Sequence, residues 1–73
     1  MANYEARTDV TGAVSKIVTS VGQTLAAGDT IMIIESMKME IPVIAEEGGT
    51  IKEILVDEGR NVAEGQVVAI LET

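Results

Sequence analysis

The middle of the 73-residue chain reads Glu35-Ser36-Met37-Lys38-Met39-Glu40. An apolar run precedes these residues at positions 31–34, and a second apolar run follows them at positions 41–44. Two strand-like runs separated by a short polar segment predict a β-hairpin. Lys38 then lies at the tip of the hairpin, where its ammonium group extends into solvent on a four-carbon stem.

The composition predicts one small all-β domain that covers residues 1–73. Hydrophobic residues make up 47% of the chain, but Tyr4 is the only aromatic residue, so isoleucine and valine supply much of the apolar volume. These β-branched residues favour strands over helices. No segment keeps a helical apolar period for long enough to require a helix.

Charge and residue usage argue against several classes of function. Twelve acidic residues against five basic ones give a net charge of −7, which disfavours binding to a nucleic acid backbone. The chain has no cysteine and no histidine, so we expect no metal site, no catalytic residues and a reducing compartment, the cytoplasm. Its apolar runs are too short to span a membrane, and its first residues lack the features of a signal peptide.

The second half of the chain repeats the first. A shift of 37 residues places residues 12–35 on residues 49–72 without a gap. The matched pairs are Gly12 and Gly49, Val14 and Ile51, Ile17 and Ile54, Gly22 and Gly59, Leu25 and Val62, Ala26 and Ala63, Gly28 and Gly65, Ile31 and Val68, Ile33 and Ile70, and Glu35 and Glu72. A repeated unit predicts two halves related by an approximate two-fold axis.

Each predicted half supplies strands with one apolar face, and neither half can bury that face alone. The halves are therefore expected to pack together as a two-layer or flattened-barrel β structure. Val14 and Ile17 lie three positions apart, as do Ile51 and Ile54, which breaks the strand period of two. The same break in both halves predicts a bulge or bend where a strand passes between the sheets. The symmetry places Lys38 at one end of the molecule, on the segment that joins the halves.

The central residues resemble the biotin-attachment motif, whose core is Met-Lys-Met with the lysine as the biotinylated residue. The flanking pattern is also similar to that family, with Gly12 opening a strand and Gly22 and Gly28 at turns. The resemblance extends over about residues 9–73 and points to the biotinyl/lipoyl attachment domain family. It implies a flattened β-barrel, or barrel-sandwich hybrid, of two four-stranded antiparallel sheets with the lysine on an exposed hairpin turn.

The function implied by this resemblance is that of a biotin carboxyl carrier, which is not an enzyme by itself. A biotin protein ligase attaches biotin covalently to Lys38. The carrier then moves carboxybiotin from a biotin carboxylase to a carboxyltransferase, which acts on an acyl-CoA such as acetyl-CoA or on a keto acid.

The chain departs from the family pattern at one place and selects one of its subtypes at another. Many members have Pro and Met shortly before the first glycine, where this chain has Asp9-Val10-Thr11-Gly12. This departure affects the local turn and not the attachment site. The gapless repeat leaves no room for the protruding loop of some bacterial carriers, so the chain resembles the thumbless type.

Each residue beside the lysine has two interpretations. Met37 and Met39 either fill gaps in the core or, beside the cofactor, form a flexible apolar platform that selects biotin over lipoate. Lipoyl domains share the fold and typically have Asp-Lys-Ala at this point. Glu35 and Glu40 are either solubilising charges or, as the resemblance implies, residues that the ligase recognises. Pro42 has no N–H group to donate, so we expect it at a sheet edge or a bulge.

Two other functions are also compatible with the sequence. One is a lipoyl domain of a dehydrogenase complex, which the two methionines argue against. The other is an unmodified interaction module, such as an adaptor domain in a transporter. A Lys38→Ala substitution would leave the cellular role of such a module intact, whereas a carrier would lose its role completely.

Overall fold

Eight β-strands make up the fold in the computed structural model, which describes residues 2–73. In chain order they are β1 (Asn3–Arg7), β2 (Gly12–Ile17), β3 (Thr24–Leu25), β4 (Thr30–Ser36), β5 (Met39–Ile44), β6 (Gly49–Ile54), β7 (Asn61–Val62) and β8 (Val67–Glu72). They form two four-stranded antiparallel sheets, ordered β1-β8-β6-β3 and β5-β4-β2-β7. The predicted all-β class with two four-stranded sheets is confirmed. Within residues 2–73, no helix has the length and apolar character needed to cross a membrane.

The internal repeat is visible in the order of the strands. A shift of 37 residues places β2 on β6, β3 on β7 and β4 on β8, and it also brings β1 onto β5. Replacing every strand by its mate converts the order of one sheet into the order of the other. The predicted two-fold relation is therefore confirmed, and it relates one sheet to the other.

Both predicted bulges are present. The register shifts between Val14 and Lys16 where β2 pairs with β4, and between Ile51 and Glu53 where β6 pairs with β8. The expectation that a strand passes between the sheets at these places was wrong, because β2 and β6 each remain in one sheet. A bulge lets each strand bend and twist without leaving its partners.

Apolar side chains from the two sheets fill the space between them. The side chains of Ile31, Met32, Ile34, Ile51 and Leu71 are almost completely buried. Removing a side chain of this size from water contributes about 1.5–3 kcal/mol. Ile31 and Met32 are neighbours, yet both face inward, because a third register shift lies between Thr30 and Met32.

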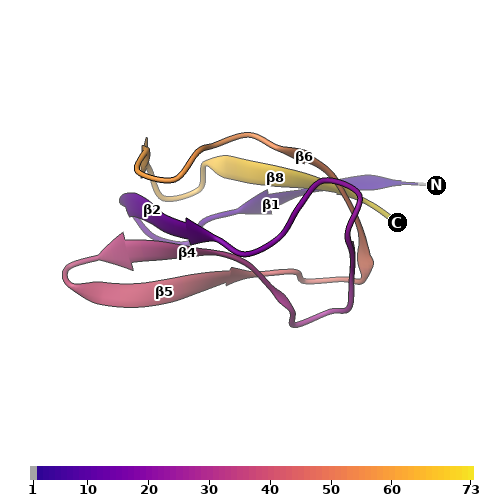
Figure 1. The fold of residues 1–73 in the computed structure, drawn as a ribbon, viewed down its shortest axis with the longest axis horizontal. Coiled ribbons are helices and arrows are strands. Elements are labelled where there is room, and N and C mark those ends of the chain that lie inside the picture. Colours follow the sequence, from indigo (N-terminus) through magenta and orange to yellow (C-terminus); the bar gives the residue numbers. More distant parts are fainter. Residues whose placement is uncertain (1) are drawn as a thin grey trace.

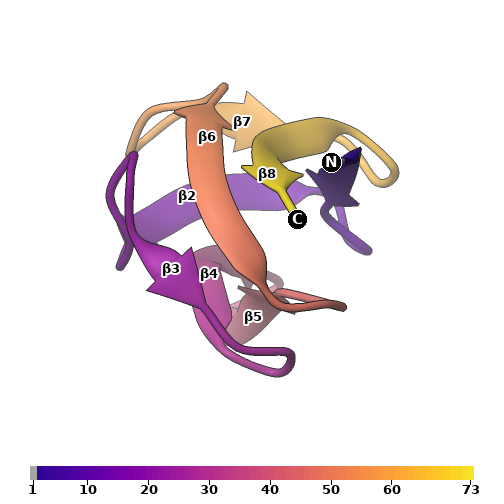
Figure 2. The ribbon, with the colours of Figure 1, turned by 90° about the vertical axis from the view of Figure 1, so that its right-hand side faces the viewer.

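The molecule is elongated, with extents of 36 × 17 × 17 Å. The hairpin of β4 and β5 forms one end of it, and the two ends of the chain lie together at the other (Figure 1). There, the N–H group of Thr73 donates to the carbonyl oxygen of Ala2 over 2.8 Å. Figure 2 shows the two layers of strands from this terminal end. The long axis thus separates the hairpin from the chain termini.

Candidate functional site

The predicted hairpin is present and has the shortest common type of loop. Ser36 pairs with Met39 across β4 and β5, so Met37 and Lys38 alone form the turn. Both have positive φ angles, 52° for Met37 and 64° for Lys38, and they are the only non-glycine residues among 2–73 that do. Two successive positive φ values are typical of a type I′ turn, which usually has Asn-Gly at these positions. A left-handed conformation costs a residue with a side chain roughly 1–2 kcal/mol.

Lys38 is exposed, and it lies in the turn of the β4–β5 hairpin, which forms one end of the long axis (Figure 1), as predicted. Within residues 2–73, the one ion pair joins Arg7 to Glu5 over 2.7 Å, and no hydrogen bond holds the Lys38 side chain. The Lys38 amine is therefore accessible to another protein from solvent. A group that must be modified and must then visit other proteins needs this kind of access, and it does not need a pocket.

The two methionines beside the lysine lie on the surface. Met37 is 91% exposed and Met39 is 62% exposed, whereas Met32 in the same hairpin is fully buried. The interpretation of Met37 and Met39 as core gap-fillers was therefore wrong. Two exposed, flexible and polarizable side chains thus flank Lys38 in the sequence, and such side chains adapt to different partners.

Glu35 and Glu40 lie directly opposite each other, one pair below the Ser36–Met39 pair. Both are exposed. Like charges on directly opposite residues destabilise a strand pair slightly, so this pair is not explained by the stability of the hairpin. The structure places the two acidic residues opposite each other next to the turn, and their role in recognition stays a prediction. Pro42 lies on the edge strand β5, as predicted.

Two polar contacts that the sequence did not predict join the tip of the hairpin to neighbouring segments. The Ser36 hydroxyl donates to the carbonyl oxygen of Thr11 over 2.8 Å. The Thr11 hydroxyl in turn accepts from the backbone N–H of Glu64 over 3.0 Å. Thr11 belongs to the segment where the chain departs from the family pattern, and this departure was the one available signal.

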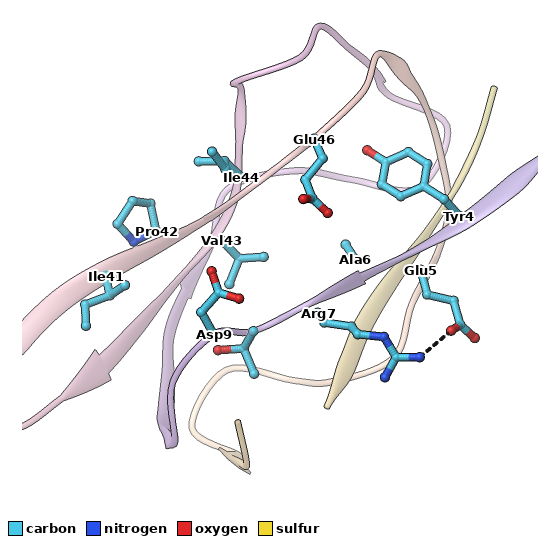
Figure 3. Close-up of a pocket in the computed structure, with 11 residues that line it drawn as sticks. Tyr4, Glu5, Ala6, Arg7, Asp9, Ile41, Pro42, Val43, Ile44 and Glu46 are labelled. Carbon is cyan, nitrogen blue, oxygen red and sulfur yellow. Dashed lines mark hydrogen bonds and ion pairs between the residues drawn. The ribbon is translucent and has the colours of Figure 1, made fainter. Parts of the chain in front are cut away.

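A cavity lies elsewhere, between the edge strands β1 and β5 (Figure 3). It is an open groove of about 270 Å³. Its lining includes Arg7, Asp9 and Val43, but none of the residues from 35 to 40. Tyr4 lies at one side of this groove, where its hydroxyl donates to the carbonyl oxygen of Glu47 over 2.8 Å. Among residues 2–73, no three His, Cys, Asp or Glu side chains gather closely enough to hold a metal ion.

Comparison with known proteins connects this geometry to a family. Residues 5–71 match the biotin/lipoyl family described as "Biotin-requiring enzyme". The "Biotinylated protein TB7.3 homolog" of Mycobacterium leprae is 33% identical over 67 residues, which cover 92% of this chain and 94% of that protein. The "Biotin-dependent acyl-coenzyme A carboxylase alpha3 subunit" of the same organism is 40% identical over 58 residues, covering 80% of this chain and 10% of that subunit.

The fold also matches solved structures. The urea carboxylase of Kluyveromyces lactis contains a region with a TM-score of 0.93 and 35% identity, covering 99% of this chain and 6% of that one. The chain thus spans nearly all of one relative and a small part of the two carboxylases. Matches also include components of dehydrogenase complexes whose names contain dihydrolipoyllysine.

This chain belongs to the biotin/lipoyl attachment family, as the resemblance of its central motif implied. The matches support covalently attached biotin as the cofactor and a carboxylase as the setting. Domains of this family are carriers, in keeping with a site that is convex and exposed.

Proposed function

We propose that this chain is a biotin carboxyl carrier and that biotin is attached to Lys38. The observation that carries the proposal is the position of Lys38 on an exposed two-residue turn at one end of an elongated molecule. The flanking exposed methionines and the match to a biotin-requiring family support it. The proposal treats residues 1–73 as a single biotinyl domain.

Attachment requires an outside enzyme, a biotin protein ligase. In the step, the neutral amine of Lys38 attacks the carboxyl carbon of an activated biotin, an amide bond forms, the activating group leaves and the amine loses a proton. An exposed turn gives access to the amine but does not activate it, so activation is expected to come from the ligase. Glu35 and Glu40, which lie paired just below the turn, are proposed as part of the surface that the ligase recognises.

The attached biotin then carries a carboxyl group between two other active sites. In this proposal a biotin carboxylase loads the group and a carboxyltransferase delivers it. The chain contributes effective concentration, because a tethered carrier meets both active sites far more often than a free one. The long axis supports this role, since it holds the cofactor on the end away from the chain termini.

The acceptor of the carboxyl group is proposed to be an acyl-CoA. The M. leprae acyl-coenzyme A carboxylase subunit supports this choice, while the match to a urea carboxylase names the competing acceptor. Neither acceptor leaves a signature in the carrier itself, because the acceptor binds to the carboxyltransferase. Acetyl-CoA is one acyl-CoA among several.

Lipoate is the second candidate cofactor, because relatives from dehydrogenase complexes also match. The test supplies the purified chain with a biotin ligase, biotin and ATP in one reaction, and with a lipoate ligase, lipoate and ATP in another. Intact mass should show one biotinyl group in the first reaction and no addition in the second. The biotinylated chain should then take label from bicarbonate when mixed with a biotin carboxylase and ATP. Lipoylation without biotinylation would reverse the assignment.

A further inference from the structure

The hydrogen bonds beside the turn of the hairpin break the two-fold symmetry of the molecule. Ser36 and Thr73 are repeat mates, and each donates its hydroxyl to a backbone carbonyl oxygen. Thr73 bonds to Ala2, whose repeat mate is Met39 on the adjacent strand. Ser36 instead reaches to Thr11, a residue in the segment between β1 and β2.

The second hydrogen bond of this network, between Thr11 and Glu64, is also found only at the hairpin end of the molecule. Thr11 accepts from the N–H of Glu64, but its repeat mate is Gly48, which has no side chain. The mate of Glu64 is Ala27. The fold therefore does not require these contacts, because its other half forms the same strands without them.

The turn above Ser36 is held in a conformation that its residues do not favour. Met37 and Lys38 both have positive φ angles, and neither is glycine, asparagine or aspartate. Such residues persist in this conformation only where the surrounding structure enforces it. Ser36 is the residue directly before the turn, so its contact to Thr11 fixes the strand from which the turn departs.

We propose that Ser36 and Thr11 are positioning residues that hold the Met37–Lys38 turn in one orientation for the enzymes that act on Lys38. This inference rests on the proposed function. The Ser36 hydroxyl donates to the segment between β1 and β2 at Thr11. The Thr11 hydroxyl connects that segment to the β7–β8 turn by accepting from the N–H group of Glu64. The turn is then already in the conformation that a partner binds. This raises the apparent affinity, because affinity falls when only a fraction of the molecules have the binding conformation.

The test compares Ser36→Ala and Thr11→Val with the hydroxyl-preserving variants Ser36→Thr and Thr11→Ser. Thr73→Val serves as the matched control, since it removes the equivalent hydroxyl bond at the opposite end. Two quantities are measured on each chain: hydrogen exchange of the Met39 amide before any modification, and the KM and kcat of biotinylation by the ligase.

Ser36→Ala and Thr11→Val should speed exchange at Met39 and raise KM about two- to tenfold with kcat unchanged, which is the range of one net hydrogen bond. The double variant should add little to either single one, because the two contacts act in series. Ser36→Thr, Thr11→Ser and Thr73→Val should behave like the unaltered chain.

Three results would overturn the proposal: unchanged exchange and KM in Ser36→Ala, an equal change in Thr73→Val, or a loss in kcat alone. The last would give Ser36 a part in the chemistry and not in positioning. Should the unaltered chain accept no biotin, the proposed function fails by itself, and the exchange rates of the unmodified chains still decide whether Ser36 and Thr11 hold the turn.

Discussion

Gly12 lies directly against the carbonyl group of Glu35. A Cβ atom at position 12 would overlap the carbonyl oxygen of Glu35, and at its repeat mate Gly49 it would lie 2.9 Å from the carbonyl oxygen of Glu72. These two glycines therefore serve close packing of neighbouring strands. At Gly22, by contrast, the space is open and the φ angle is +92°, which suits a turn.

Gly12→Ala should destabilise the protein more than Gly49→Ala, because the overlap at position 12 is more severe. Both changes force the backbones of adjacent strands apart, and overpacking of this kind costs about 1–3 kcal/mol. Urea unfolding of the two variants beside the unaltered chain measures the difference. If Gly49→Ala lowered the free energy of unfolding more than Gly12→Ala, the closer approach of β2 to β4 at Gly12 would be contradicted.

Met37→Asn combined with Lys38→Gly should make the protein more stable. The pair Asn-Gly is favoured in a type I′ turn, and it would relieve about 1 kcal/mol or more of backbone strain. For a domain of this size, 1 kcal/mol corresponds to a rise in Tm of about 4–8 °C. Lys52→Gly in the middle of β6 is the control and should lower Tm. An unchanged or lower Tm in the double variant would mean that the turn stores no strain.

Met37→Asp combined with Met39→Ala should leave stability nearly unchanged and reduce biotin transfer. Both methionines are largely exposed, and surface changes usually stay within about 0.5 kcal/mol. Met32→Ala, which empties a buried position of the same hairpin, should cost about 2–5 kcal/mol. Thermal unfolding and ligase kinetics separate the two effects. Biotinylation of the Met37→Asp, Met39→Ala double variant at the rate of the unaltered chain would show that the two methionines do not select the cofactor.

The sequence predicted the features that repeat or that follow from residue type. The 37-residue shift indicated the two-fold relation, the spacing of Val14 and Ile17 indicated a bulge, and the apolar runs around Lys38 indicated the hairpin. These signals are local or periodic, so they can be recognised in a single amino-acid sequence. The family followed from the same central residues.

Other features depend on contacts between distant segments and left no local signal. The mate of β1 is β5, but Asn-Tyr-Glu-Ala-Arg and Glu-Ile-Pro-Val-Ile share no residue at matching positions. The bond from Ser36 to Thr11 joins residues 25 positions apart. The exposure of Met37 could not be read from its apolar side chain, since it follows from the left-handed turn that removes it from the strand.

The attachment of biotin to Lys38 is tested by the intact mass of the chain after incubation with a biotin ligase, biotin and ATP. The chain has three lysines, Lys16, Lys38 and Lys52, and all three are exposed. Arginine at each position in turn preserves the charge and removes the acceptor amine. We expect one added biotinyl group in the unaltered chain, in Lys16→Arg and in Lys52→Arg, and none in Lys38→Arg. A folded chain that gains no biotin, or a Lys38→Arg variant that still gains it, would contradict the assignment of Lys38 as the attachment site.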